Sequence, residues 1–280
     1  VLQVVWYWLT MWNHFGILSV ITLANPEKDH CMRPVTTSSP AKNYGDTIQA
    51  VLNRIQTHEA EAVRAAAQAL ADRIAHGGVV HVFGAGHSQL VAADTTFRAG
   101  GAAWMNGILD PALSIARGAL ASTATERIEP MADGIFEQVA PQPHDATIAV
   151  TNSGVTPITR RWAERARDAG LLVIGIASKA STQHFESAGH ATLAATSHHT
   201  LNNHVPVGDV AVGLNGSEPT FGPVSTIVTC FLAQWLIVHT HEVLHERGEE
   251  VHAFRSGHMS DSRDHNAALI ARYGPRIDVL

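Results

Sequence analysis

A hydroxyl-rich turn, Thr151-Asn152-Ser153-Gly154-Val155-Thr156, holds the residues of this chain best suited to bind an anion. Residues 147–150 before it form a short apolar run typical of a buried parallel strand, and Pro157 opens a helical stretch after it. Hydroxyls and backbone N–H groups at a helix start suit a phosphate, because the helix dipole is positive there. The same residue types also cap helices for structural reasons alone. The turn has no lysine, so it is not a nucleotide P-loop.

A second turn follows the same plan. Gly84-Ala85-Gly86-His87-Ser88 comes directly after the strand-like residues 79–83 and leads into a helix. Because the carboxyl ends of parallel strands meet at one edge of a sheet, the two turns are expected to form one crevice there. Together they favour a phosphorylated small molecule as the ligand.

The elements that position these turns alternate between strand and helix. Strands are predicted at residues 79–83, 102–109, 147–150 and 171–177, with a weaker fifth strand at 191–196. Helices are predicted at 46–76 with Asp46 as N-cap, after the second turn through Arg98, and at 126–139, 157–169, 224–247 and 264–273. This order predicts an α/β fold, a three-layer αβα sandwich around a five-stranded parallel sheet with flavodoxin-like topology.

Composition limits the classes of function. The 280 residues are 45% hydrophobic, enough for one sizeable core, and the net charge of −6 comes with no basic stripe. We therefore expect no nucleic-acid partner. Cys31 and Cys230 are the only cysteines, which excludes a disulfide framework and a cysteine-based zinc site and favours a cytoplasmic location.

Residues 1–45 differ from the rest and are predicted to be a leader and linker, with the folded domain at 46–280. Residues 1–24 are apolar and aromatic, but they lack the basic start of a secretory signal and are short and impure for a membrane span. Residues 34–40 form a Pro/Ser/Thr-rich linker. We expect the leader to be disordered, or translation to begin at Met32, and no membrane partner. A genuine membrane anchor is the alternative.

The two turns resemble the phosphate-facing signatures of sugar isomerase (SIS) domains, and Gly222-Pro223-Val224-Ser225-Thr226 resembles a third element that lines the same pocket. Further short sequence motifs are similar to those of uncharacterised bacterial SIS-domain proteins: Arg98-Ala99-Gly100-Gly101, Asn203-His204-Val205-Pro206, Gly208-Asp209 and His265-Asn266. The resemblance covers residues 46–277. It implies the SIS fold, a phosphorylated sugar as ligand, no cofactor and no metal, and a site that is often completed across a subunit interface.

The resemblance also implies a binding set. Phosphate or adjoining sugar oxygens would be bound by Ser88, Thr151, Ser153 and Thr156, with His87 and Asn152 in the same turns. Gly86 and Gly154 would let the backbone approach the ligand closely, while Ser225 and Thr226 would contact the sugar end of the ligand. SIS domains serve isomerases, an etherase and sugar-phosphate sensors. An aldose–ketose or amino-sugar-phosphate isomerase is the first hypothesis, and a non-catalytic sensor is the alternative. Ile227 stands where some aldose–ketose enzymes have a catalytic lysine. Ala93-Asp94 stands where two acidic residues are expected in the closest relatives.

Isomerisation needs a group that moves a proton, and carboxylates and histidines near the turns are the candidates. Glu126 is preferred over Glu218 and Asp94, although each could be a solvated acid or stabilise a helix start. His265 is preferred over His87, His204 and His258, because in related domains a C-terminal segment folds over the pocket to complete the site.

The long helix at 224–247 carries two further signals. His241-Glu242-Val243-Leu244-His245 formally matches the H-E-x-x-H zinc motif, which makes a zinc hydrolase a remote alternative. The motif lies at the opposite end of the helix from Ser225, where a solvated tip is expected. Phe231, Trp235 and their neighbours make the helix apolar on several faces. A homodimer or homotetramer is therefore expected.

Overall fold

The computed structural model describes residues 39–214 and 217–280. The predicted leader lies outside these described residues, while residues 40–45 of the predicted linker already belong to the first helix, α2 (Pro40–His58). Ser39 caps this helix by accepting a hydrogen bond from the Lys42 N–H at 3.2 Å, so the predicted cap at Asp46 is wrong.

Five parallel strands form the central sheet, in the order β2-β1-β3-β4-β5. Their bounds are β1 (Val80–Gly84), β2 (Met105–Gly107), β3 (Ala146–Val150), β4 (Leu172–Ala177) and β5 (His199–Asn202). All residues of β1, β3 and β4 are buried, as expected of parallel strands covered on both faces. The predicted three-layer fold and its flavodoxin-like strand order are confirmed.

The fifth strand was predicted in the wrong place. Residues 193–195 form a 3-10 turn, and β5 follows at residues 199–202. β5 lies at the edge of the sheet, where only Leu201 of its four residues is buried, so its sequence is too polar for the apolar pattern of a central strand.

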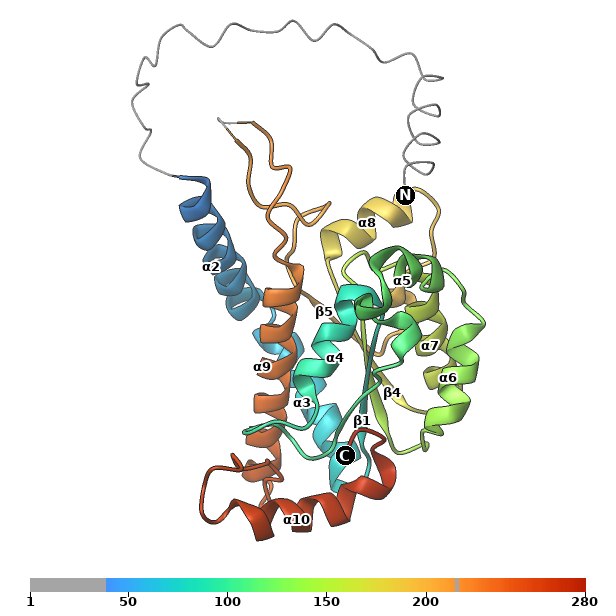
Figure 1. The fold of residues 1–280 in the computed structure, drawn as a ribbon, viewed down its shortest axis with the longest axis vertical. Coiled ribbons are helices and arrows are strands. Elements are labelled where there is room, and N and C mark those ends of the chain that lie inside the picture. The colour runs from blue at the N-terminus through green and yellow to red at the C-terminus, as the bar shows by residue number, and fades with distance from the viewer. Residues whose placement is uncertain (1–38, 215–216) are drawn as a thin grey trace, which may run out of the picture. The chain divides into compact units, whose positions relative to one another are not determined.

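Helices cover both faces of the sheet (Figure 1). The side chains of β3 alternate between two buried clusters: Ile148 packs with α3 (Ala60–Ala75) and α9 (Ser225–Glu246), and Ala149 with α6 (Met131–Val139) and α7 (Pro157–Asp168). The remaining α-helices are α4 (Gln89–Thr95), α5 (Ala119–Thr125), α8 (Lys179–Ser187) and α10 (Ser262–Tyr273).

Two predicted helices differ from the observed ones. The span 46–76 is interrupted at Glu59, between α2 and α3, and the helix predicted at 126–139 begins only at Met131 of α6, directly after Pro130. The helix predicted to run through Arg98 ends at Thr95. Glu59 therefore lies between two helices, where its side chain contacts Asn202 and His204, and Glu126 lies at the end of α5 instead of the start of a helix.

The apolar character of α9 follows from its packing. By length and composition this 22-residue helix could cross a membrane, with a mean hydropathy of 1.4 in its most apolar window, yet half of that window is buried inside the fold. Leu232 and Leu236 belong to the same buried cluster as α3 and β1. A helix with this packing is a core helix of the domain.

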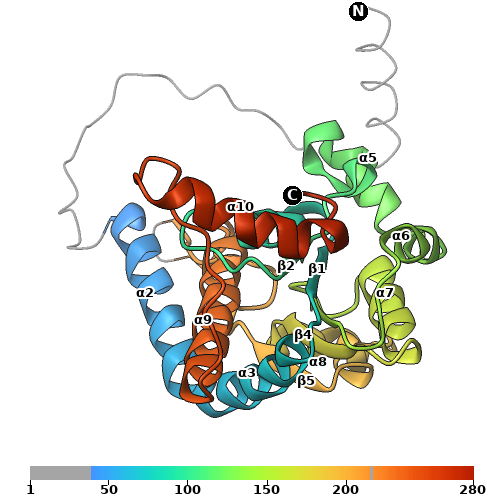
Figure 2. The same cartoon turned by 90° about the horizontal axis from the view of Figure 1, so that it is seen from below.

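A buried carboxylate fastens the C-terminal end to the amino edge of the sheet. Asp145, fully buried just before β3, accepts hydrogen bonds from the backbone N–H groups of Val79 at 2.9 Å and Gln142 at 2.7 Å. The His81 ring contacts it at 3.1 Å, and Arg276 Nη2 contacts both of its oxygens, at 2.8 and 2.7 Å. Figure 2 accordingly shows α10 and the C-terminus close to β1.

Candidate functional site

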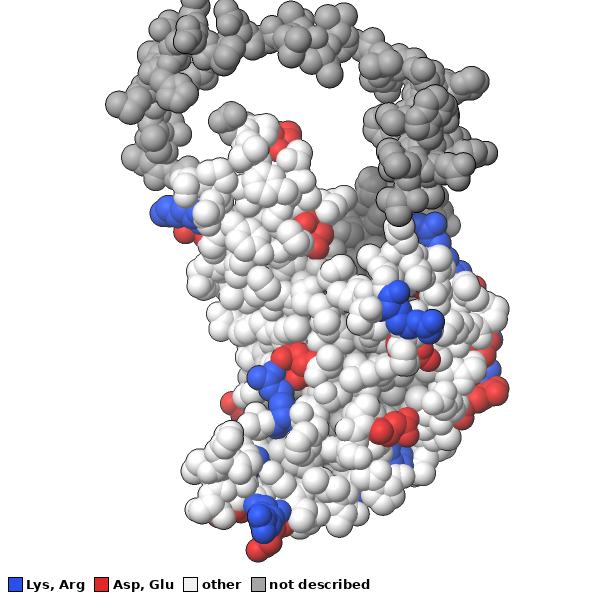
Figure 3. Space-filling model, in the orientation of Figure 1, with Lys and Arg blue, Asp and Glu red and all other residues white. Residues whose placement is uncertain are grey.

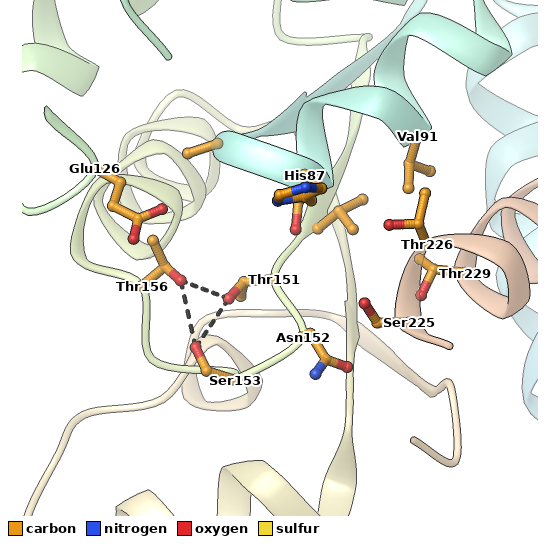
Figure 4. Close-up of a pocket in the computed structure, with 13 residues that line it drawn as sticks. His87, Val91, Glu126, Thr151, Asn152, Ser153, Thr156, Ser225, Thr226 and Thr229 are labelled. Atoms are coloured by element: carbon orange, nitrogen blue, oxygen red, sulfur yellow. Dashed lines mark hydrogen bonds between the residues drawn. The ribbon is translucent and has the colours of Figure 1, made fainter. Parts of the chain in front are cut away.

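One pocket, with a volume of ≈ 190 Å³, brings the predicted turns together at the carboxyl edge of the sheet. It is lined by Ala85, His87, Ser88, Val91, Glu126, Val150, Thr151, Asn152, Ser153, Thr156, Ser225, Thr226 and Thr229. The lining comes from the ends of β1 and β3 with the turns that follow them, from α4, from the end of α5 and from the first two turns of α9 (Figure 4). All three sequence motifs therefore meet in one cavity.

Three hydroxyl groups meet between β3 and α7. Thr151 Oγ1 lies 2.7 Å from Thr156 Oγ1, and Ser153 Oγ lies 3.2 Å from the first and 3.3 Å from the second (Figure 4). Among the described residues, no acceptor is bound by the backbone N–H groups of Asn152, Ser153 or Thr156. Hydroxyls that can rotate their protons outward and unused N–H groups at a helix start are the components of an anion site.

Thr156 is the N-cap residue of α7, yet its side chain makes no capping hydrogen bond. Ser178 in the same domain behaves differently, because its hydroxyl caps α8 by accepting from the Ser181 N–H at 3.1 Å. The Thr156 hydroxyl instead turns toward Thr151. A purely structural role as helix cap therefore does not account for the hydroxyls of this turn.

Glycine is required at the centre of the turn. Gly154 has φ +76°, and a Cβ atom there would lie 2.0 Å from Thr182 Oγ1. Gly86 in the first turn has φ +59°, and a Cβ there would lie 3.6 Å from Glu126 Oε2. Both glycines hold left-handed backbone that other residues rarely adopt. The second value also shows how close the Glu126 carboxyl lies to the first turn.

Of the residues that the structure describes, Glu126 is the one carboxylate in the lining. It ends α5, where its N–H donates to the Ser122 carbonyl at 2.9 Å, and its carbonyl accepts from the Ile158 N–H of α7 at 3.1 Å. Its side chain points into the pocket (Figure 4), and no donor among the described residues hydrogen-bonds its carboxyl group. Burial raises the pKa of Glu126, and the charge of Arg127 opposes this only in part.

The first turn of α9 forms the opposite end of the pocket. Ser225, Thr226 and Thr229 line it, and Thr229 was not predicted. Its position, one helical turn after Ser225, is the signal that could have revealed it. Asp209 was also missed: its carboxylate accepts from the N–H groups of Val224 at 3.0 Å and Ser225 at 2.9 Å, and from the Ser225 hydroxyl at 2.7 Å.

A buried network supports the floor of the pocket. Asn203, 1% exposed, donates through Nδ2 to Asn152 Oδ1 and to Thr229 Oγ1, both at 3.0 Å. Next to it, His204 is held by Glu59 through a 2.8 Å contact between His204 Nε2 and Glu59 Oε1. Glu59 also accepts from the Asn202 N–H at 3.1 Å, so the break between α2 and α3 brings a carboxylate to the end of β5.

The structure does not bring His265 to this pocket. Its ring contacts the Ala253 carbonyl at 2.9 Å, on α10 beside the amino edge of the sheet. The reason is the length of α9: 22 residues carry the chain about 33 Å away from the pocket before α10 begins. The predicted placement of His265 over the pocket of its own chain is wrong.

Of the other acid–base candidates, His87 lines the pocket, and the rest lie elsewhere. Asp94 pairs with Arg98 and accepts from Gln234 Nε2 at 2.9 Å. Glu218 and His258 are exposed on loops and do not line the pocket. His204 is committed to Glu59 in the network behind the pocket.

The H-E-x-x-H motif does not form a metal site in the described part of the chain. The His241 ring packs 5.3 Å from the Trp104 ring, so this end of α9 is not the solvated tip that was expected, whereas His245 is exposed. No group of three potential histidine, cysteine or carboxylate ligands lies together among the described residues. The donor set that zinc requires is therefore missing there.

Comparisons with known proteins agree with the motifs. The SIS domain profile matches residues 43–178. The UPF0309 protein SCO4393 of Streptomyces coelicolor is 33% identical over 244 residues, which span 85% of this chain and 96% of the relative. The UPF0309 protein BH0227 of Halalkalibacterium halodurans is 29% identical over 242 residues, with 85% and 96% covered.

Among solved structures, a phosphoheptose isomerase from Francisella tularensis superposes with a TM-score of 0.45 and 17% identity, covering 75% of this chain and 99% of that one. The Vibrio vulnificus NanR protein, solved in complex with ManNAc-6P, gives 0.44 and 12%, with 84% and 70% covered. The extent and level of the sequence similarity to SCO4393 define the family. The chain belongs to the UPF0309 family of SIS-domain proteins.

Proposed function

We propose that this chain binds a phosphorylated sugar in the pocket and isomerises it, as an aldose–ketose or amino-sugar-phosphate isomerase. The observation that carries the binding step is the Thr151–Ser153–Thr156 hydroxyl cluster, which faces a helix start without capping it. Hydrogen bonds to a charged group contribute about 1.5–3 kcal/mol each. Several such bonds can hold a phosphate although neither lysine nor arginine lines the pocket in the described part of the chain.

For the chemical step we assign the proton transfer to Glu126. Aldose–ketose isomerisation removes a proton from the carbon beside the carbonyl and returns it to the former carbonyl carbon, while a hydroxyl proton moves between the two oxygens. A carboxylate whose pKa is raised by burial is a better base than an ordinary glutamate, and it can return the proton after accepting it. In the pocket, the Glu126 carboxylate lies beside the proposed phosphate site at the 151–156 turn.

A sensor that binds the same ligand without turnover is the second candidate. It is favoured by the position of His265, which leaves Glu126 and His87 as the acid–base side chains of the described residues that line the pocket. Turnover separates the two functions: the chain is incubated with each phosphosugar it binds, and the isomer is followed by chromatography. Conversion supports the isomerase, and binding without conversion supports the sensor.

The phosphate site is tested by removing its hydroxyls. In thermal-shift and calorimetric titrations against a phosphosugar panel, Ser153→Ala and Thr156→Val are each expected to weaken binding roughly tenfold, about 1.4 kcal/mol. Unphosphorylated sugars should give no shift with any variant.

Thr159→Val is the matched control, since the Thr159 hydroxyl on α7 is buried, has no hydrogen-bond partner among the described residues and does not line the pocket. It should bind as the unmodified chain does and be no less stable. If no phosphosugar binds the unmodified chain, the proposed function is wrong.

We also expect the chain to form a homodimer or homotetramer in the cytoplasm. Large apolar side chains on α9 and α4 are exposed, with Ile227 at 47%, Val238 at 53% and Leu90 at 40%. On the face drawn in Figure 3, lysine and arginine side chains are scattered among acidic ones, so this face has no basic stripe for nucleic acid.

The association is tested by light scattering after size exclusion. Ile227→Glu combined with Val238→Glu should lower the mass to that of one chain, whereas Leu120→Glu, at an 89% exposed site on α5, should not. A monomeric unmodified chain would contradict the expectation.

A further inference from the structure

The helix start of α9 at the pocket is already occupied by a carboxylate of the chain itself. Asp209 follows Gly208 in a left-handed turn, with φ +54° after φ +83°. One of its oxygens accepts from the N–H groups of Val224 and Ser225, at 3.0 and 2.9 Å, and the other from the Ser225 hydroxyl at 2.7 Å. The positive end of the α9 dipole is therefore neutralised, in contrast to the open start of α7.

The Asp209 contact fixes what Ser225 can offer a ligand. An ionised carboxylate can only accept hydrogen bonds, so the single proton of the Ser225 hydroxyl is directed at Asp209. The remaining lone pairs of the Ser225 oxygen are left for the pocket that this residue lines. Ser225 is consequently a hydrogen-bond acceptor beside a negative charge.

The β3 side of the pocket has the opposite polarity, and the backbone determines it. The Val205 N–H donates to Asn203 at 3.1 Å, which identifies the accepting atom as Asn203 Oδ1. Asn203 Nδ2 must then donate to Asn152 Oδ1 and to Thr229 Oγ1. The Asn152 amide N–H₂ remains as a donor on the β3 side, next to the unused N–H groups of the 151–156 turn, while the Thr229 hydroxyl proton remains as a donor on α9, one helical turn beyond Ser225.

We propose that Asp209 is a specificity-determining residue, which makes the Ser225 position at the α9 end of the pocket select a hydroxyl or ammonium group and reject a second anion. This inference rests on the proposed function. The phosphate lies at the 151–156 turn, where donors gather, and the opposite end of the ligand donates a hydrogen bond to Ser225. Sugar phosphates that end in a carboxylate or a second phosphate place an anion beside Asp209, and like charges repel there.

Two matched pairs of probes test this by isothermal titration with the full-length chain. Glucitol 6-phosphate and 6-phosphogluconate share the phosphate and an open carbon chain, and they differ at C1, a hydroxyl in the first and a carboxylate in the second. Fructose 6-phosphate and fructose 1,6-bisphosphate form the second pair. In each pair the first probe is expected to bind at least tenfold more tightly, a difference of about 1.4 kcal/mol.

Asp209→Asn should reverse the polarity of Ser225. Asparagine tolerates the left-handed conformation and its Oδ1 can still accept from the two N–H groups, but its amide N–H₂ would donate to the Ser225 oxygen. The Ser225 proton is then free to turn toward the pocket. Binding of glucitol 6-phosphate should weaken, and the preference within each pair should shrink at least tenfold.

Ser225→Ala provides the comparison, because it removes the acceptor and keeps the charge of Asp209. It should weaken glucitol 6-phosphate while 6-phosphogluconate remains excluded. Equal affinity of the unmodified chain within both pairs, or an equal loss for all four probes in Asp209→Asn at an unchanged Tm, would overturn the inference and leave the proposed function standing. If none of the four probes binds while other phosphosugars do, the hydroxyl selection assigned to Ser225 is wrong. Absence of binding to any phosphosugar refutes the proposed function itself.

Discussion

Replacing Glu126 by glutamine is expected to lower turnover of the phosphosugar by roughly 10²–10⁴-fold, the contribution of a well-placed acid–base group. Glutamine has nearly the same shape as glutamate but cannot take up the proton. Binding should be unchanged or slightly tighter, because the substitution removes a negative charge from a pocket that holds a phosphate. The loss should therefore appear in kcat and hardly in KM.

The pH dependence of the unmodified chain should carry the signature of this residue. A base must be deprotonated to act, so activity should rise with pH through the pKa of Glu126. Burial raises that pKa above its ordinary value of 4.5, and the acidic limb of kcat/KM should move up with it. In Glu126→Gln the residual activity should lack this limb.

The stability of Glu126→Gln shows whether a loss of activity comes from the catalytic step or from a loss of folding. Burial of a charged Glu126 is unfavourable, so the glutamine variant should be as stable as the unmodified chain or more stable. Glu129→Gln is the matched control, since Glu129 follows on the same segment, pairs with Arg160 at 2.6 Å and does not line the pocket. Full activity in Glu126→Gln, measured under saturating substrate, would remove Glu126 from the mechanism.

The local sequence pattern was sufficient to predict the layers of the fold and the three segments that line the pocket, residues 84–88, 151–156 and 222–226. The apolar strands before Gly84 and Thr151 and the glycines inside the turns are consequences of neighbouring residues, which a sequence displays directly. The bounds of α7 and α9 came out within two residues for the same reason. The break at Glu59 was not predicted, because the helical periodicity of the sequence continues on both sides of it. At the break, Glu59 contacts Asn202 and His204, more than 140 residues away, and no local pattern announces such a contact.

The contrast between local pattern and long-range contacts also explains which residues of the candidate site could be predicted. Residues on the turns themselves were predicted. Asp209 and Asn203, on the loop after β5, do not line the pocket but hydrogen-bond Ser225 and Asn152, which do, and sequence spacing does not reveal such contacts. His265 failed for the opposite reason: its segment resembles that of related domains, but where α10 lies depends on the length and direction of α9. Glu126 was selected as the start of a helix and lies instead at the end of one, although it does reach the pocket.

The largest effect on stability is expected at Asp145. Burial alone would raise its pKa, but hydrogen bonds from His81, Gln142 and Val79 outweigh burial and hold the pKa at about 2, against an ordinary 3.8. Asp145→Asn keeps the size of the side chain, leaves Arg276 without its carboxylate partner and turns an N–H₂ group toward existing donors. Breaking a buried pair costs about 3–5 kcal/mol, and the lower end applies because Arg276 is partly exposed. The Tm should fall by roughly 6–12 °C.

The pH dependence of this loss identifies the charge as its cause. Because the folded pKa is depressed, the carboxylate contributes stability above the unfolded value near 3.8, about 2 kcal/mol, and loses it as the pH falls toward 2. The difference in free energy of unfolding between the unmodified chain and Asp145→Asn should therefore be constant above pH 5 and shrink between pH 5 and 2. Arg276→Gln should cost less, since Val79, Gln142 and His81 still hold the carboxylate. A difference that stays constant down to pH 2 would mean that packing around Asp145, rather than its charge, fastens the C-terminal end to the sheet.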